Sequence, residues 1–146
     1  ARLGGPRSGD ASPGGVLRAS RVRRAMSVGH RLLLVTPDVD VERAFAEAFG
    51  DAFAVTACPS ADEALTHLGA RYYPLVVADY ALPGRDGAWL LGEVRRLMPS
   101  TRRVLVSATA VRDLFDLRAE GVIELFLPKP LDPEDLRAYL RPPPRP

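Results

Sequence analysis

The sequence predicts an α/β fold, a doubly wound parallel sheet in which five strands alternate with five helices. Short apolar runs alternate with segments of helical periodicity, and short joints rich in Gly and Pro separate them. Apolar runs without alternation are typical of strands that are covered on both faces, as in parallel sheets. With 146 residues, of which 47% are hydrophobic, the chain is long enough for one globular domain.

The first half of the chain contains three strand-like runs and two helix-like segments. Gly50 is suited to end the first helix in a left-handed conformation, and the pattern Ser60-Ala-Asp-Glu63 predicts a capping box at the start of the second. We expect strands at residues 32–35, 52–57 and 75–79, and helices at residues 38–49 and 60–68.

The second half continues the same alternation. Asp86 is suited to start a helix as its N-cap, as Asp38 is in the first half. Asp132 followed by Pro133 is the clearest helix start in the chain. Right-handed crossovers between the strands then predict the strand order 2-1-3-4-5. We expect strands at residues 104–106 and 122–127, and helices at residues 87–98, at residues 111–120 and from Pro133 to before Pro142.

Charge and composition divide the chain into three parts. Residues 1–30 carry six arginines against Asp10 alone and are rich in Gly, Ser and Pro, so we expect residues 1–29 to be disordered. One interpretation is a basic arm that binds nucleic acid or an acidic surface. The other, which we favour, is a non-native leader that precedes a natural start at Met26. Residues 30–141 are the expected domain, and residues 142–146 are a proline-rich tail.

Composition also excludes several classes of protein. No apolar run is long enough to span a membrane. The single cysteine, Cys58, excludes an internal disulfide and is typical of a reducing compartment, so we expect a cytoplasmic protein with Cys58 as a small core residue. His30 and His67 lie far apart in the sequence, and no His or Cys cluster has the spacing of metal ligands.

Polar side chains occur where the predicted strands end. Asp79 ends the third strand, Ser107 follows the fourth, Lys129 follows the fifth, and Thr36-Pro37-Asp38 follows the first. The carboxyl ends of parallel strands meet at one edge of the sheet, where ligands bind. A carboxylate, a hydroxyl and an ammonium at one crevice are suited to handling phosphoryl groups. Lys129 is the one lysine beside 19 arginines, which indicates that a compact point charge is needed there.

Three motifs in order, LVVADYALPGRDG, VLVSATA and FLPKPLDPEDL, resemble the receiver domains of bacterial response regulators in two-component signalling. The resemblance covers about residues 31–141 and implies the flavodoxin-like (βα)5 fold. It implies that Asp79 is the phosphoacceptor and that Ser107 and Lys129 bind the phosphoryl group. It also implies that Phe126 is the aromatic switch and that the peptide bond before Pro130 is cis. On pattern alone, Phe126 is a half-buried sheet residue.

The resemblance implies partners and no enzymatic activity. A histidine kinase or a phosphotransfer protein would donate the phosphoryl group, and a downstream target protein or output domain would read the phosphorylated state. The sequence leaves open whether the domain forms a homodimer. We expect no membrane binding, and no nucleic-acid binding except through the basic arm.

The chain departs from the family pattern after the first strand. Receivers usually have two adjacent acidic residues there, which help to hold a divalent cation, and this chain has Thr36 and Pro37. Mg²⁺ prefers near-octahedral oxygen ligands, so the remaining candidates, Asp79 and Asp38, predict a weak metal site. With few carboxylates nearby, Asp79 and Lys129 are free to form a direct ion pair.

Two hypotheses of function follow. In the first, Asp79 accepts a phosphoryl group and the domain then signals by protein contact. In the second, the domain is a pseudo-receiver, an interaction module that signals without phosphorylation because the acidic pair is absent. A hydrolase is disfavoured, since dehalogenase-type phosphohydrolases have a second acid where this chain has Ala81. No glycine-rich phosphate loop follows the first strand, which disfavours dinucleotide binding.

Overall fold

The computed structural model describes residues 30–50 and 52–141. The predictions for residues 1–29 and 142–146 lie outside the described residues. None of the helices in the described ranges has the length and apolar composition that crossing a bilayer requires.

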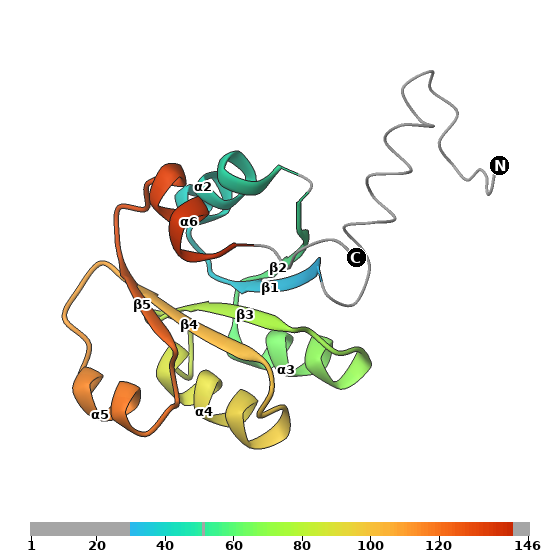
Figure 1. Ribbon diagram of the computed structural model, residues 1–146. Helices are drawn as coiled ribbons and strands as arrows, with labels where there is room; N and C mark the ends of the chain where they lie inside the picture. Colours follow the sequence, from blue (N-terminus) through green and yellow to red (C-terminus); the bar gives the residue numbers. More distant parts are fainter. Residues whose placement is uncertain (1–29, 51, 142–146) are drawn as a thin grey trace, which may run out of the picture.

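The described residues form a five-stranded sheet in the order β2-β1-β3-β4-β5, with every neighbouring pair parallel (Figure 1). This arrangement confirms the predicted fold class and strand order. β2 and β5 form the two edges of the sheet. The strands are β1 (Arg31–Val35), β2 (Ala54–Cys58), β3 (Leu75–Asp79), β4 (Arg102–Ser107) and β5 (Leu125–Pro128).

Helices cover both faces of the sheet (Figure 1). α2 (Val39–Phe49) and α6 (Pro133–Tyr139) pack against each other on one face. α3 (Ala61–Ala70), α4 (Gly87–Leu97) and α5 (Leu114–Ala119) lie on the other face. α5 differs from the other helices because none of its residues is fully buried and no side chain caps its first turn.

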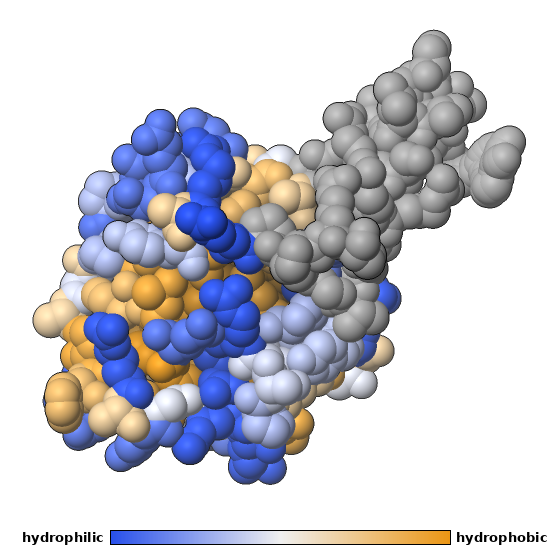
Figure 2. All heavy atoms as spheres, viewed as in Figure 1, coloured by the Kyte–Doolittle hydropathy of each residue, from blue (hydrophilic) through white to orange (hydrophobic). Residues whose placement is uncertain are grey.

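An apolar area lies on the face where β5 forms the edge of the sheet between α5 and α6 (Figure 2). Leu125 and Phe126 of β5 are half-buried. The flanking helices carry exposed aromatic residues, since Phe115 of α5 is 82% exposed and Tyr139 of α6 is 55% exposed. Exposed apolar groups that gather around one strand are typical of a surface that binds other proteins.

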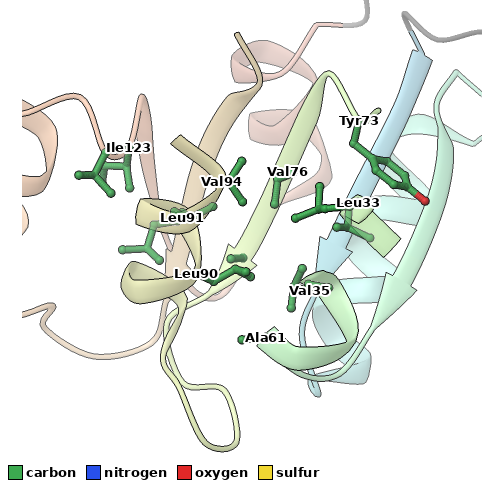
Figure 3. Packing of buried hydrophobic residues seen from close by; sticks show 14 of the residues in the cluster. Leu33, Val35, Ala61, Tyr73, Val76, Leu90, Leu91, Val94 and Ile123 are labelled. Atoms are coloured by element: carbon green, nitrogen blue, oxygen red, sulfur yellow. The ribbon is translucent and has the colours of Figure 1, made fainter. Parts of the chain in front are cut away.

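Two hydrophobic clusters fill the space between the sheet and its helices, because successive side chains of a strand point to opposite faces. Leu32 and Leu34 of β1 join the cluster under α2 and α6, whereas Leu33 and Val35 join the cluster over α3 and α4. Burial of each such side chain contributes roughly 1.5–3 kcal/mol to stability. Figure 3 shows the second cluster, in which the α4 residues are Leu90, Leu91 and Val94.

Cys58 belongs to the second cluster, as predicted for a small core residue. Burial raises the pKa of its thiol to about 11. The thiol is therefore protonated at neutral pH and is a poor nucleophile.

The predicted helix starts are confirmed by hydrogen bonds. Asp38, Asp86 and Asp132 each accept a hydrogen bond of 2.8–2.9 Å from a backbone N–H two or three residues further along. Ser60 accepts a bond of 3.2 Å from the backbone N–H of Glu63. These bonds satisfy N–H groups that have no partner inside the helix.

Several predicted element boundaries were wrong, and local hydrogen bonds explain the differences. The predicted strand 122–127 begins only at Leu125, because the N–H groups of Val122 and Ile123 donate to the carbonyl of Leu117 and complete the end of α5. Gly121 permits this chain reversal with a φ of 77°. α5 itself is shorter than the predicted helix 111–120.

Strand β2 begins two residues later than predicted, at Ala54, because the N–H of Ala52 donates to the carbonyl of Phe49 at the end of α2. Helix α3 runs through Gly69 to Ala70, since the N–H of Arg71 still reaches the carbonyl of His67. β4 is longer than the predicted 104–106 because it begins at Arg102.

Arg103 ties together the loops at the amino-terminal end of β4. Its guanidinium donates four hydrogen bonds of 2.8–3.2 Å to backbone carbonyls. Burial lowers the pKa of Arg103, but an arginine remains charged at neutral pH. The charged fork therefore satisfies carbonyl groups from two separate loops, and the acceptors are Pro99, Thr101, Gly121 and Val122.

We expect Arg103→Leu to lower the free energy of unfolding by about 2–4 kcal/mol, because partly buried carbonyls lose a charged donor. Arg102→Leu is the matched control. Arg102 pairs with Glu124 at 3.1 Å, with side chains 40% and 51% exposed, so its loss should cost only about 0–1 kcal/mol. Urea unfolding followed by circular dichroism measures both values, and equal losses would contradict the assignment.

Candidate functional site

The candidate site lies at the carboxyl ends of the strands. The register pairs Val35 with Ala78. The residues that follow them, Thr36 just after β1 and Asp79 at the end of β3, therefore lie at the same level of the sheet. β4 extends this row on one side, and Ser107 pairs there with Pro128. Four strand tips therefore place their polar residues around one point, as the sequence predicts.

Asp79 is 2% exposed, and its two carboxylate oxygens have different surroundings. Oδ2 accepts hydrogen bonds from Lys129 Nζ at 2.6 Å and from Thr36 Oγ1 at 3.0 Å. Among the described contacts, Oδ1 accepts only a long bond of 3.4 Å from the backbone N–H of Ala81. One oxygen is thus held by two donors, and the other has lone pairs to spare.

Lys129 connects Asp79 to Asp38. Its Nζ lies 2.8 Å from Asp38 Oδ2, and its own side chain is 16% exposed. Burial lowers the pKa of Lys129, but the hydrogen bonds that its ammonium donates to both carboxylates outweigh that effect and the pKa is raised overall. The predicted ion pair between Asp79 and Lys129 is confirmed, and Asp38 joins it as a second acid.

Ser107 is buried at the adjacent strand tip. Its hydroxyl donates to the carbonyl of Thr109 at 2.8 Å and accepts from the N–H of Thr109 at 3.0 Å. The backbone N–H of Lys129 donates to the carbonyl of Ser107 at 2.8 Å, which holds the two tips together. The peptide bond between Lys129 and Pro130 is cis, as the resemblance implied.

Phe126 is half-buried and packs against the cluster on the side of α4. This placement agrees with the interpretation of Phe126 as a sheet residue. The proposed roles of Phe126 as a switch and of Ser107 as a phosphoryl ligand stay predictions.

Gly87 determines how closely α4 approaches the site. A Cβ atom at this position would lie 2.2 Å from the backbone carbonyl oxygen of Asp79 and 3.1 Å from Leu105 Cδ1. The N–H of Gly87 also donates to the carbonyl of Tyr80 at 3.0 Å. The first turn of α4 therefore packs directly on the backbone that carries Asp79, a contact that only glycine permits.

The donor atoms do not fit a dedicated Mg²⁺ site. Mg²⁺ needs a near-octahedral set of oxygen ligands at short distances. In the described part of the chain, no group of three or more Asp, Glu, His or Cys side chains could hold a metal ion. The two carboxylates that were predicted as ligands, Asp38 and Asp79, are both bound by Lys129. Weak Mg²⁺ affinity stays a prediction.

Sequence reasoning missed the contacts that Thr36 and Asp38 make in the site. Thr36 was considered only as a replacement for an acid, yet its hydroxyl donates to Asp79 and accepts from the N–H of Asp38 at 3.0 Å. Asp38 was considered as a helix cap and weak metal ligand, and it is also an ion-pair partner of Lys129. The parallel register of the neighbouring strands β1 and β3 was the signal that could have indicated the contact between Thr36 and Asp79.

Comparison with known families and proteins gives a consistent result. The family model of the response regulator receiver domain matches residues 32–141. Over 84 residues, the chain is 36% identical to the uncharacterized 14.6 kDa protein in the sodA1 3′ region of Leptolyngbya boryana, covering 56% of this chain and 64% of that protein. Over 83 residues, it is 32% identical to the C4-dicarboxylate transport transcriptional regulatory protein DctD of Rhizobium meliloti, covering 56% of this chain and 18% of DctD.

Solved structures show the same architecture. The signal receiver domain of an HD domain-containing protein from Pseudomonas fluorescens has 27% sequence identity and a TM-score of 0.71, covering 80% of this chain and 87% of that chain. A CheY-like response regulator receiver domain protein from Methanospirillum hungatei has 21% identity and a TM-score of 0.69, covering 76% of this chain and 90% of that chain. At 21% identity, the second similarity concerns the fold alone.

We expect Gly87→Ala to destabilise the domain by about 1–3 kcal/mol, because the new methyl group forces α4 away from the backbone of Asp79. Gly92→Ala is the matched control within the same helix. No atom lies within 4 Å of a Cβ there, so it should be neutral or stabilising by about 0.5–1 kcal/mol. Thermal unfolding measures both, and a loss of equal size in both variants would contradict the close approach at Gly87.

We expect Asp38→Asn to lower stability in a pH-dependent way. The hydrogen bond from Lys129 holds the pKa of Asp38 below its usual value, so the carboxylate contributes stability that is complete above its unfolded pKa of about 3.9. This contribution is lost as the pH falls through the lower, folded pKa. Asn keeps the N-cap, so the substitution isolates the charge. Urea unfolding should show a constant difference above about pH 5 that shrinks in acid; a difference independent of pH would contradict this.

Proposed function

This chain belongs to the response regulator receiver domain family, and from that premise we propose that Asp79 accepts a phosphoryl group from a histidine kinase or a phosphotransfer protein. The observation that carries the proposal is the asymmetry of the Asp79 carboxylate. Oδ2 is held by Lys129 and Thr36, whereas Oδ1 has one long contact among the described residues. The carboxylate is thus oriented with one oxygen that is only weakly hydrogen-bonded, and this oxygen is the proposed nucleophile.

In the proposed reaction, Oδ1 attacks the phosphorus atom of a phosphohistidine. A phosphorus–oxygen bond forms and the phosphorus–nitrogen bond breaks. The electron pair of the broken bond goes to the imidazole nitrogen, which then takes a proton. The product is an aspartyl phosphate at position 79.

In this proposal, three groups on the protein receive the charge of the phosphoryl group. Lys129 Nζ is already within 2.6 Å of the carboxylate. The N–H of Ala81 faces Oδ1, and the hydroxyl of Ser107 lies at the neighbouring strand tip. Phosphoryl transfer depends mainly on positioning and on neutralising charge, so these groups suit the role.

We also propose how the phosphorylated state is read. For Ser107 to reach a phosphoryl oxygen, its hydroxyl must leave Thr109, which would move the segment that leads to α5. Phe126 lies on β5, and the exposed Phe115 and Tyr139 lie on α5 and α6, the helices on either side of that strand (Figure 1). A downstream target protein or an output domain would bind there, and dimerisation through this face is a further form of the same contact.

The same site also supports a second candidate function, that of a pseudo-receiver that signals without phosphorylation. The observation that favours it is the closed ion-pair network around Asp79, which is 2% exposed and has Thr36 and Pro37 nearby in place of an acidic pair. In that state Lys129 neutralises Asp79 without a phosphoryl group. The partner face would then be constant.

Phosphoryl incorporation decides between these functions. The protein is incubated with acetyl phosphate, with Mg²⁺ in one arm and a chelator in the other, and intact mass is recorded. We expect an adduct that Asp79→Asn reduces by at least about tenfold, since the amide is not a nucleophile. Ser107→Ala should weaken retention of the adduct but not abolish its formation.

The control for a short-lived adduct is a beryllofluoride complex, detected as a rise in melting temperature. If neither an adduct nor a beryllofluoride complex forms while circular dichroism shows a native fold, the phosphoacceptor proposal fails. The pseudo-receiver function then takes its place.

A further inference from the structure

We infer that the ammonium group of Lys129 takes the position that a divalent cation would occupy between the two carboxylates, so that it offsets part of their negative charge without Mg²⁺. The inference concerns the same site as the proposed function, and its meaning for signalling rests on that function. It applies to the binding of cations by the unmodified domain, which is measured separately.

The geometry of Lys129 carries the first step. Its Nζ lies 2.6 Å from Asp79 Oδ2 and 2.8 Å from Asp38 Oδ2, so a single positive group bridges acids from two different strand tips. The Lys129 side chain is 16% exposed and that of Asp79 is 2% exposed. The Asp38 side chain is 32% exposed, so only the Lys129–Asp79 part of the bridge is screened by water much less than a surface ion pair.

Apart from Asp79 Oδ1, the other side-chain oxygen atoms near the bridge are already engaged. The hydroxyl of Thr36 donates to Asp79 Oδ2 and accepts from the N–H of Asp38. Asp38 Oδ1 accepts from the N–H of Asp40 at 2.9 Å, which caps α2. A Mg²⁺ ion would have to displace Lys129 from both carboxylates and rearrange these bonds to obtain its near-octahedral shell.

Charge leads to the same result. Asp38 and Asp79 carry two negative charges and Lys129 carries one positive charge, so the bridge has a net charge of −1. A divalent cation that entered while Lys129 kept its place would reverse this sign unless a further acid were present. The nearby positions that could supply one are Thr36 and Pro37, and neither can ionise.

The choice of residue supports the inference. Arginine occurs 19 times in this chain and lysine once, at position 129. A guanidinium is a planar fork, whereas an ammonium is a compact charge that can approach oxygen atoms from several directions, as a small cation does. Lysine is the side chain that can replace a metal ion at this point.

Titration of the full chain with Mn²⁺ and Mg²⁺ tests the inference. Free Mn²⁺ is followed by electron paramagnetic resonance, and Mg²⁺ binding by calorimetry. We expect the wild type to bind either ion no more tightly than Asp79→Asn does. Lys129→Gln should bind Mn²⁺ at least about tenfold more tightly than the wild type, because removal of the ammonium leaves Asp38 and Asp79 free to coordinate.

Two further variants complete the test. Asp79→Asn in the Lys129→Gln background should remove the gained affinity, which assigns it to this site. Pro37→Asp adds a carboxylate at an exposed position and should raise Mn²⁺ affinity with Lys129 intact, because the third acid restores the charge that a dication needs.

The inference is overturned if the wild type binds Mg²⁺ saturably below millimolar concentration and Asp79→Asn abolishes that binding. It is also overturned if folded Lys129→Gln binds Mn²⁺ no better than the wild type. If Lys129→Gln does not fold, the comparison of the wild type with Asp79→Asn decides alone. No phosphoryl donor is present, so this result is independent of whether Asp79 is phosphorylated.

Discussion

The ion-pair bridge of Lys129 with Asp38 and Asp79 is the interaction on which the rest of the site depends. It joins the tips of β1, β3 and β5. Lys129 is 91 residues from Asp38 and 50 residues from Asp79 along the chain. A buried carboxylate without a partner would be costly, so the three tips must come together for any of them to be stable there. The bridge thus couples the chemistry of the site to the assembly of these strands in the sheet.

Backbone contacts position the residues of this bridge. The parallel register brings Thr36 level with Asp79, and the missing side chain at Gly87 allows α4 to press on the carbonyl of Asp79. At the opposite end of β4, Arg103 fixes the loops from which β4 and β5 start. The strand tips are therefore aligned by contacts at both ends of the sheet.

Much of this architecture was predictable from the sequence because it depends on local patterns. Apolar runs located all five strands, and Asp38, Asp86 and Asp132 located three helix starts. The predicted element boundaries were wrong where hydrogen bonds outside the regular helix and strand patterns set the end of an element. At Val122 and Ile123, the N–H groups bond to the end of α5 and do not extend β5. The Lys129–Asp79 contact was foreseen from charge, whereas the roles of Thr36 and Asp38 depend on the register of strands distant in sequence, which periodicity does not encode.

Helix α5 buries none of its residues completely, has no side-chain cap, and begins after Asp113 in a left-handed conformation. Its unfolding therefore exposes less apolar surface than the unfolding of a helix with fully buried residues, since only Leu114 and Leu117 pack partly against the core cluster. Local opening free energies span a wide range within one protein, and an element of this kind lies near the low end. In hydrogen-exchange terms, the amides of α5 should lose protection while the central strands remain closed, so the domain contains one segment whose order can change without melting its core.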